Sequence, residues 1–218
     1  MTSIPPVFRY TLYGAAGSGS VAVEATLDLV GAPYDLIDIP TFESDAQRER
    51  MAAINPMRQI PALVLPGGEL LTESAAILMW LADRHPEAKL CPAIDDAARA
   101  QYLRWMVFLP AAIYPMYWVR DVPSRLAEGA DAERVIRQRT IERIAECWRA
   151  MEAQVRPGRY ILGDTLTVLD LYVAVVSRWS PGRERFAREA PRLAEVVARV
   201  DADPRLTDLW ARRFPSGT

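Results

Sequence analysis

Residues 55–86, NPMRQIPALVLPGGELLTESAAILMWLADRHP, contain the strongest structural signals in this chain of 218 residues. A run of strand formers over residues 62–65 stops at the Pro-Gly-Gly sequence of residues 66–68, which is typical of a turn. Residues 69–72 predict a short return strand. Residues 73–84 predict a helix, because apolar side chains recur there at helical spacing. The stretch therefore predicts a β-hairpin that leads directly into a helix.

Two features of this hairpin are unusual for a purely structural element. Pro61 opens the first strand, where its missing N–H would leave a gap in the ladder unless that strand edge faces something else. Glu73 and Ser74 place an acid and a hydroxyl in the first turn of a helix, where free backbone N–H groups attract anions. The structural alternative is a capped helix that follows a hairpin.

In combination, these motifs resemble the glutathione-binding half of the soluble glutathione transferases. The elements of the resemblance are I-P-A-L, a glycine turn, E-S-x-A-I and a helix that ends in L-A-D. In that family the proline before the strand is cis. The resemblance implies that glutathione is the co-substrate and that six residues bind it: Arg58, Gln59, Ile60, Pro61, Glu73 and Ser74.

The resemblance also implies a role for each of these residues. The backbone of Ile60 pairs with the cysteinyl unit of glutathione. Glu73 meets the γ-glutamyl ammonium, and Ser74 with the helix N-terminus meets the γ-glutamyl carboxylate. Gln59 and Arg58 reach other polar groups of the tripeptide.

Composition excludes several other functions. Lys and Arg total 26 against 28 Asp and Glu, and no long run of one charge argues for nucleic acid binding. No apolar run approaches the ~18 residues of a membrane span. One histidine and two distant cysteines argue against a clustered histidine metal site and against a disulfide scaffold. Reduced cysteines fit a cytoplasmic location.

The first third of the chain predicts an alternating arrangement. A strand over residues 8–13 precedes a glycine-serine loop at 14–20 and a helix at 21–30. A second strand follows at 34–39, and a short polar helix at 45–53. With the hairpin and its helix, the order is β-α-β-α-β-β-α. This order is the thioredoxin-like arrangement that glutathione transferases use.

The glycine-serine loop also invites a dinucleotide-binding interpretation. Asp38 follows about twenty residues after the loop, as a ribose-binding acid does in that fingerprint. However, Gly14, Gly17 and Gly19 occur in the reverse of the G-x-G-x-x-G order. A β-hairpin then follows in place of a second βαβ unit, which argues against a dinucleotide site.

The position of this loop at a helix start makes it a candidate thiolate site. Backbone N–H groups and the hydroxyls of Ser18 and Ser20 could stabilise a thiolate, although either serine could simply cap the helix. The resemblance to serine-type transferases implies Ser18 as the catalytic residue, with Ser20 in reserve. Tyr13 is a third candidate, because some classes use a tyrosine there; a core aromatic role is the alternative.

In the bacterial beta-type enzymes a catalytic cysteine lies one residue after the serine position. Gly19 occupies that position in this chain. The absence of the cysteine argues against mixed-disulfide chemistry.

The second half of the chain predicts only helices. A proline-marked linker covers residues 85–96. A long helix over residues 97–120 should be interrupted by Pro110 and Pro115. A second long amphipathic helix covers residues 131–155. The predicted fold is therefore an α/β thioredoxin-like domain over residues 1–86 and an all-α domain over residues 97–218.

A capped helix is predicted near the middle of the second domain. Thr167 and Asp170 have the spacing of a capping box, with Asp in place of the usual Glu or Gln. The surrounding G-D-x-L-T-x-x-D pattern resembles the capped core helix of the glutathione transferases. Two final helices are predicted over residues 191–200 and 204–213.

The first helix of the second domain carries an apolar stripe that could line a substrate cleft. Four residues recur there at three- or four-residue intervals: Met106, Pro110, Tyr114 and Tyr117. In similar proteins one end of this helix lies across from the glutathione site. Core packing is the alternative role for the same residues.

Together these features predict a glutathione transferase that conjugates the glutathione thiolate to a small apolar electrophile in a detoxifying reaction. By analogy with cytosolic relatives we expect a homodimer, with no nucleic acid, membrane or metal involved. Two alternatives remain on the same scaffold. One is a glutathione-dependent peroxidase or isomerase, and the other is a non-catalytic protein that binds glutathione and acts through partner contacts.

Overall fold

The computed structural model describes residues 9–215 and divides the chain into two compact units. The first unit contains the residues up to Leu90 together with those from Asp201 onward, and the second contains Cys91–Val200. The predicted second domain ran from residue 97 to residue 218. The structure differs at its end, because the last helix packs within the first unit.

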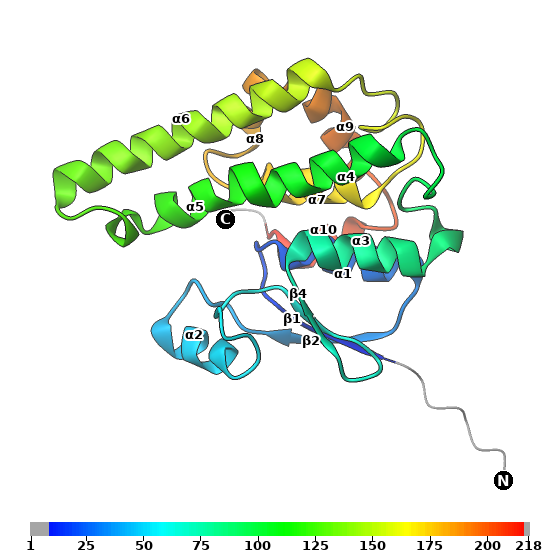
Figure 1. The fold of residues 1–218 in the computed structure, drawn as a ribbon, viewed down its shortest axis with the longest axis horizontal. Coiled ribbons are helices and arrows are strands. Elements are labelled where there is room, and N and C mark those ends of the chain that lie inside the picture. The colour runs from blue at the N-terminus through cyan, green and yellow to red at the C-terminus, as the bar shows by residue number, and fades with distance from the viewer. Residues whose placement is uncertain (1–8, 216–218) are drawn as a thin grey trace, which may run out of the picture. The chain divides into compact units, whose positions relative to one another are not determined.

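The first unit contains a four-stranded sheet in the order β2-β1-β3-β4 (Figure 1). Strand β1 pairs parallel with β2 and antiparallel with β3, and β3 pairs antiparallel with β4. The predicted β-α-β-α-β-β-α order is confirmed, while Phe8 of the predicted first strand lies outside the described residues. The elements are β1 (Tyr10–Gly14), α1 (Ser20–Val30), β2 (Tyr34–Asp38), α2 (Asp45–Ala52), β3 (Ala62–Val64), β4 (Leu70–Thr72), α3 (Ser74–Arg84), η1 (Pro86–Ala88) and α10 (Thr207–Arg213).

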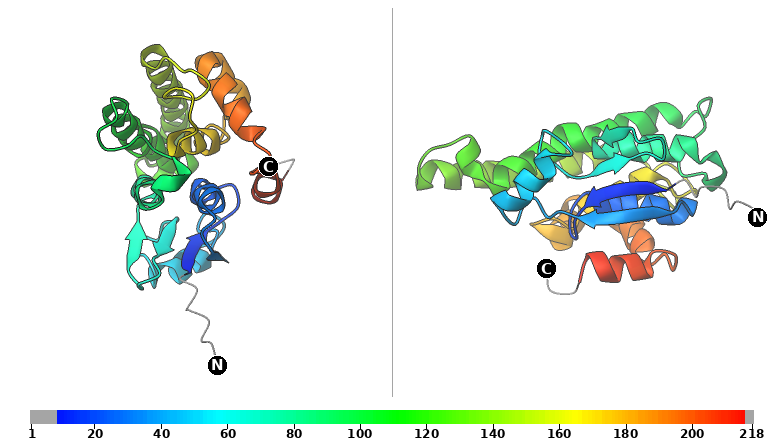
Figure 2. Two further views of the ribbon diagram at one scale, coloured as in Figure 1. Left: turned by 90° about the vertical axis from the view of Figure 1, so that its right-hand side faces the viewer. Right: turned by 90° about the horizontal axis from the view of Figure 1, so that it is seen from below.

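Helices α1 and α3 lie on the same face of the sheet (Figures 1 and 2). The first eight residues of α1 are all buried, and so are Leu12 of β1 and Leu63 of β3. Burial of a leucine side chain contributes roughly 1.5–3 kcal/mol, so the apolar layer between α1 and the sheet stabilises this unit. A smaller cluster includes Met51 of α2.

The second unit is helical, as predicted. Its elements are α4 (Arg99–Phe108), η2 (Leu109–Ile113), α5 (Tyr114–Asp121), η3 (Pro123–Arg125), α6 (Ala130–Gln154), α7 (Val168–Val176), α8 (Gly182–Glu189) and α9 (Pro191–Asp201). The predicted interruption at Pro110 is confirmed, because the π-helical turn η2 separates α4 from α5. Proline has no N–H for the helical ladder and therefore favours such a break. The sequence did not predict α8, whose only buried residue is Phe186.

Helix α7 is buried along its whole length and begins with the predicted capping box. The Asp170 carboxylate accepts hydrogen bonds from the backbone N–H of Ile161, from the backbone N–H of Thr167 and from the Thr167 hydroxyl, each at 2.8 Å. The Asp170 side chain is completely buried. The start of this helix is therefore closed by its own side chains.

Candidate functional site

Asn55 organises the loop that leads to the predicted glutathione-binding residues. Its side chain is buried, and its amide Nδ2 donates to the carbonyl of Gln59 at 2.9 Å. Its Oδ1 accepts the backbone N–H of Met57 at 3.0 Å. No role for Asn55 is predicted from the sequence, although an Asn-Pro pair is a recognised signal for a turn that a side chain closes.

The peptide bond between Ile60 and Pro61 is cis, as the resemblance implies. Strand β3 lies between β1 and β4, so Pro61 does not border an open strand edge. Pairing of β3 instead begins at Ala62, opposite Tyr13 on one side and Thr72 on the other. Because Pro61 has no N–H to donate, Ile60 and Pro61 lie beyond the end of the ladder.

Glu73 has an unusual backbone conformation at the start of α3, with φ 65° and ψ 107°. Such angles are costly for a residue with a side chain and concentrate at functional sites. Its carbonyl accepts the first helical hydrogen bond, from the N–H of Ile77 at 2.9 Å. Within the described part of the chain, no side-chain cap closes this helix, and Ser74 begins it. The first amides of α3 therefore lie at an electropositive helix terminus that the Glu73 side chain does not cap.

Arg58 and Gln59 are both exposed. Arg58 has φ 58°, and its guanidinium pairs with the Glu49 carboxylate at 3.0 Å. The Gln59 side chain projects from the loop whose carbonyl is held by Asn55. Arg58 and Gln59 directly precede Ile60, in the loop that Asn55 holds in place.

Ser18 lies in the loop before α1 and is half-buried. Its hydroxyl donates to the carbonyl of Ala15 at 2.8 Å, and its oxygen accepts the backbone N–H of Ser20 at 3.2 Å. The Ser18 and Ser20 hydroxyl oxygens are 2.9 Å apart, so either can donate to the other. The structure thus brings the two candidate serines together in one hydrogen-bonded group.

Ser20 is fully buried beneath this loop. Its Oγ accepts the N–H of Ala15 at 3.0 Å and can donate to the carbonyl of the same residue at 3.2 Å. Gly14 is required here because a Cβ at that position would collide with the Ser20 hydroxyl. These contacts favour a structural role for Ser20 and leave Ser18 as the more accessible hydroxyl.

Tyr13 is half-buried on β1 and packs against the cluster of Ile39, Met51 and Ala62. This environment fits the core aromatic role that the sequence analysis left open. Asp38, the acid of the dinucleotide interpretation, is engaged by the guanidinium of Arg213 at 2.8 Å. That ion pair gives the Asp38 carboxylate a structural partner.

The four residues predicted for the electrophile cleft all lie in the helical second unit. Met106 is fully buried, and Pro110 is half-buried in η2. Tyr114 and Tyr117 both pack edge-on against Trp179, with ring centroids 4.9 and 5.1 Å away. The burial of Met106 and the ring contact of Tyr117 fit the core-packing alternative for these two residues.

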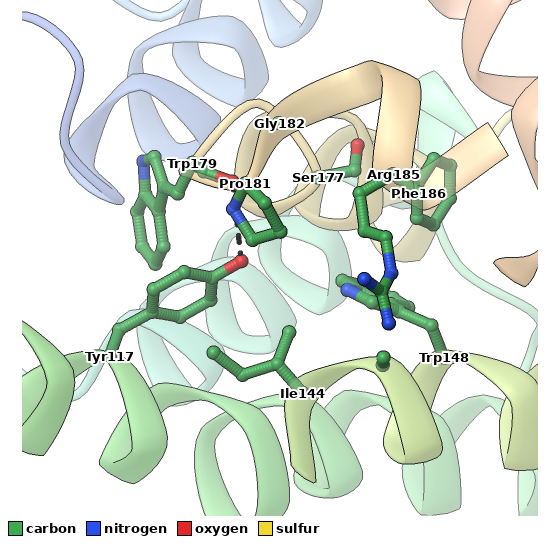
Figure 3. Close-up of a pocket in the computed structure, with 10 residues that line it drawn as sticks. Tyr117, Ile144, Trp148, Ser177, Trp179, Pro181, Gly182, Arg185 and Phe186 are labelled. Carbon is green, nitrogen blue, oxygen red and sulfur yellow. Dashed lines mark hydrogen bonds between the residues drawn. The ribbon is translucent and has the colours of Figure 1, made fainter. Parts of the chain in front are cut away.

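Tyr117 also lines a small cavity in the second unit, with Ile144, Trp148 and Trp179 among its neighbours (Figure 3). The Tyr117 hydroxyl donates to the carbonyl of Trp179 at 3.4 Å. The volume of about 10 Å³ is close to the minimum for one water molecule. This cavity is therefore too small for an organic electrophile.

Within residues 9–215, no three His, Cys, Asp or Glu side chains gather in a group that could hold a metal ion. Of the helices in the same range, none combines the length and the apolar character that a membrane span requires.

Comparison with known proteins gives consistent matches along the chain. Two family models match, for the glutathione S-transferase N-terminal domain over residues 12–89 and C-terminal domain over residues 134–212. The chain is 32% identical over 202 residues to the uncharacterized GST-like protein YncG of Escherichia coli K12, covering 92% of this chain and 97% of YncG. It is 31% identical over 169 residues to maleylpyruvate isomerase of a Ralstonia species, covering 74% of this chain and 78% of the isomerase.

A solved structure also resembles this chain closely. The crystal structure of a glutathione transferase homologue from Sulfitobacter, with bound glutathione, matches it with a TM-score of 0.84 and 26% identity. The match covers 94% of this chain and 98% of the other.

Proposed function

Because this chain belongs to the glutathione S-transferase family, we propose that it conjugates the thiolate of glutathione to a small apolar electrophile. The family membership that the motifs of residues 55–86 indicated is thereby confirmed. The observation that carries the proposal is the start of α3, where Glu73 adopts φ 65° directly before Ser74 and makes no side-chain cap. A helix start without a side-chain cap is suited to a ligand carboxylate.

The proposed binding mode uses this helix start and the end of the β3 ladder. The γ-glutamyl carboxylate lies on the first amides of α3 and the Ser74 hydroxyl. An anion at such a terminus gains about 0.3–2 kcal/mol. Glu73 pairs with the γ-glutamyl ammonium. The backbone of Ile60 pairs with the cysteinyl unit, and Arg58 and Gln59 reach the remaining polar groups.

We propose Ser18 as the residue that holds the thiolate. Its hydroxyl donates to the Ala15 carbonyl, and its oxygen can accept from the Ser20 hydroxyl and from the Ser20 N–H. In the proposed complex the Ser18 hydroxyl turns from the Ala15 carbonyl and donates to the sulfur instead. A free thiol titrates near pH 8.5, and donors at a helix start lower its pKa by one to several units. A decrease of two units corresponds to about 2.7 kcal/mol in favour of the thiolate.

In the proposed reaction the glutathione thiol first gives its proton to solvent. The thiolate sulfur then supplies the electron pair of the new bond to the electrophilic carbon. The leaving group departs with its own bonding pair, or, in an addition, the pair moves onto the adjacent atom and a proton is taken up. The Ser18 hydroxyl donates to the sulfur until the bond forms.

This proposal is tested by the ultraviolet absorbance of the thiolate of bound glutathione as a function of pH. In the wild type we expect thiolate near neutral pH. In Ser18→Ala the thiolate pKa should rise by about one unit or more. Ser44→Ala is the matched control, because Ser44 caps α2 through the N–H of Gln47. If glutathione binds to the wild type without forming thiolate, the protein is a non-catalytic glutathione-binding protein.

A glutathione-dependent isomerase is a second candidate, and the similarity to maleylpyruvate isomerase favours it. An isomerase regenerates glutathione after each cycle, whereas a transferase consumes one glutathione for each product. A panel of a maleyl-substituted acid, an aromatic halide and an organic hydroperoxide separates the two and detects peroxidase activity. Turnover of the maleyl compound without loss of glutathione would replace the transferase proposal.

We further propose a homodimer located in the cytoplasm. Apolar side chains with exposed surface support the dimer in each unit: Met57 and Leu70 in the first, and Leu103 and Val107, one turn apart on α4, in the second. Cys91 and Cys147 are both thiols that are not joined in a disulfide, which suits a reducing compartment. Light scattering of the wild type and of Val107→Glu tests the dimer. A monomeric wild type would contradict it.

A further inference from the structure

Arg213 lies near the end of the chain, in α10, which packs beside α1 in the first unit (Figures 1 and 2). Only 9% of its side chain is exposed. Burial of a guanidinium is costly unless carboxylates and hydrogen bonds compensate its charge. The partners of Arg213 therefore reveal why α10 is held in this unit.

The Arg213 guanidinium bridges two carboxylates that come from different elements. Its Nε donates to Oε1 of Glu24 at 3.0 Å, and Glu24 lies on α1 one turn after Ser20. Its two terminal nitrogens donate to both carboxylate oxygens of Asp38, at 2.8 and 3.3 Å. Such a bidentate pair fixes the orientation of the guanidinium plane as well as its position.

The backbone of Arg213 contacts the loop that carries Ser18. The N–H of Gly17 donates to the Arg213 carbonyl at 2.9 Å. Gly17 has φ 71°, a conformation that suits glycine, and Ser18 follows it directly. One residue of α10 thus contacts α1, the end of β2 and the loop before Ser18.

We propose that Arg213 is a positioning residue for Ser18. The Glu24 and Asp38 carboxylates fix its side chain, its carbonyl fixes the Gly17 amide, and the fixed loop directs the Ser18 hydroxyl toward the thiolate. This inference rests on the proposed function, in which Ser18 holds the glutathione sulfur. Arg213 itself contacts neither glutathione nor electrophile. The γ-glutamyl site at Glu73 and Ser74 is built from other elements and does not depend on it.

The experiment compares Arg213→Gln, Arg213→Lys and wild type. In Arg213→Gln, we expect the thiolate pKa of bound glutathione to rise by about one unit, a tenfold loss of thiolate below that pKa. The dissociation constant of glutathione from calorimetry should change by less than about twofold, because the thiol form still binds at α3. The thiolate pKa in Arg213→Lys should lie between those of the wild type and Arg213→Gln, since lysine keeps the charge but loses the bidentate geometry of the guanidinium. Arg212→Gln, an exposed neighbour on α10, should match the wild type.

Hydrogen exchange of the Gly17 amide gives a second measurement that needs no glutathione. The amide should exchange at least about tenfold faster in Arg213→Gln than in the wild type, with exchange in the core of α7 unchanged. If Arg213→Gln does not fold, Asp38→Asn removes only the bidentate ion pair between Arg213 and Asp38. Smaller changes in the same direction are then expected in the thiolate pKa and in the exchange rate of the Gly17 amide. The Asp38 side chain is 54% exposed, so this change leaves the core intact.

The outcomes separate the two proposals. A wild type that forms thiolate, together with a folded Arg213→Gln or Asp38→Asn of unchanged thiolate pKa, overturns the positioning role alone. A wild type that binds glutathione without thiolate overturns the proposed function, and with it the role of Ser18 that Arg213 would serve. Unchanged exchange of the Gly17 amide in the folded variant also overturns the positioning role.

Discussion

In both α3 and α7 the first backbone N–H groups have no acceptor within the helix, and the two helix starts differ in their side-chain caps. At α7 the Asp170 carboxylate and the Thr167 hydroxyl satisfy the first amides, and every residue of the helix is buried. At α3 no side chain of the described residues caps the helix, and Glu73 adopts a costly backbone conformation. The closed start serves stability. The start of α3 lacks a side-chain cap from Glu73, and an electropositive helix start of this kind suits a ligand carboxylate.

The largest effect in this comparison is expected from Asp170→Ala. The change leaves the N–H groups of Ile161 and Thr167 and the Thr167 hydroxyl without their acceptor in a buried site. Each unsatisfied buried donor costs about 1–3 kcal/mol, so we expect a loss of about 3–5 kcal/mol in the free energy of unfolding. Urea denaturation measures it. Asp131→Ala, at an exposed first-turn position of α6, is the control and should cost only a few tenths.

A loss below about 1 kcal/mol for Asp170→Ala would show that the cap of α7 is not the source of its stability. The contrast with α3 would then have no energetic basis.

The start of α1 gives an intermediate case that depends on pH. Burial, with smaller contributions from the Asp38 and Asp28 carboxylates, raises the pKa of Glu24 to about 7 against the opposing charge of Arg213. Tyr34 on β2 also interacts with Glu24. The folded state therefore holds the Glu24 proton more tightly than the unfolded chain, where the pKa is ordinary.

The sign of the pH effect follows from this difference. The contribution of Glu24 to stability is complete below its ordinary pKa near 4.5 and is lost as the pH rises through about 7. Relative to Glu24→Gln, the wild type should lose roughly 3 kcal/mol of unfolding free energy across that range. Denaturation of both proteins at several pH values measures the difference between their unfolding free energies. A difference that stays constant with pH would contradict the raised pKa.

Ser74→Ala should affect binding more than stability, the reverse of Asp170→Ala. A lost hydrogen bond to a charged group costs about 1.5–3 kcal/mol, which is about a tenfold to hundredfold weaker affinity for glutathione. The unfolding free energy without glutathione should change by less than about 1 kcal/mol. Calorimetry and denaturation give the two values. If the unfolding free energy fell as much as the binding free energy, Ser74 would have a structural role and not a ligand-binding role.

The closed helix start could be predicted from sequence because its parts are local. Thr167 and Asp170 are three residues apart, and the capping-box spacing alone identified them. The glutathione-site residues could be proposed for the same reason, since Pro61 and Glu73 belong to one hairpin and the helix after it. Residues that are a few positions apart in sequence stay close together in the folded chain.

Long-range features could not be predicted in this way. Arg213 and Asp38 are 175 residues apart, and nothing near either residue in the sequence indicates the other. The choice between Ser18 and Ser20 depends on burial, which is set by the close approach of Gly14 to the Ser20 hydroxyl. The same limit applies to Met106, whose apolar spacing fits a cleft and a core equally well.

The smallest effect is expected from Thr167→Ala, which tests how the stabilisation of the α7 cap is divided between Thr167 and Asp170. The hydroxyl is one of three donors to the Asp170 carboxylate, and its oxygen also accepts the Asp170 backbone N–H. That N–H keeps the Thr167 carbonyl as an acceptor at 3.0 Å, so the change leaves no backbone amide without a partner. A typical N-cap substitution costs about 1 kcal/mol, well below the loss expected for Asp170→Ala. Thr167→Ser keeps the hydroxyl and should recover most of the difference in urea denaturation. If Thr167→Ala cost as much as Asp170→Ala, the two residues would act as one unit, and closure of α7 would belong to the pair and not to the carboxylate.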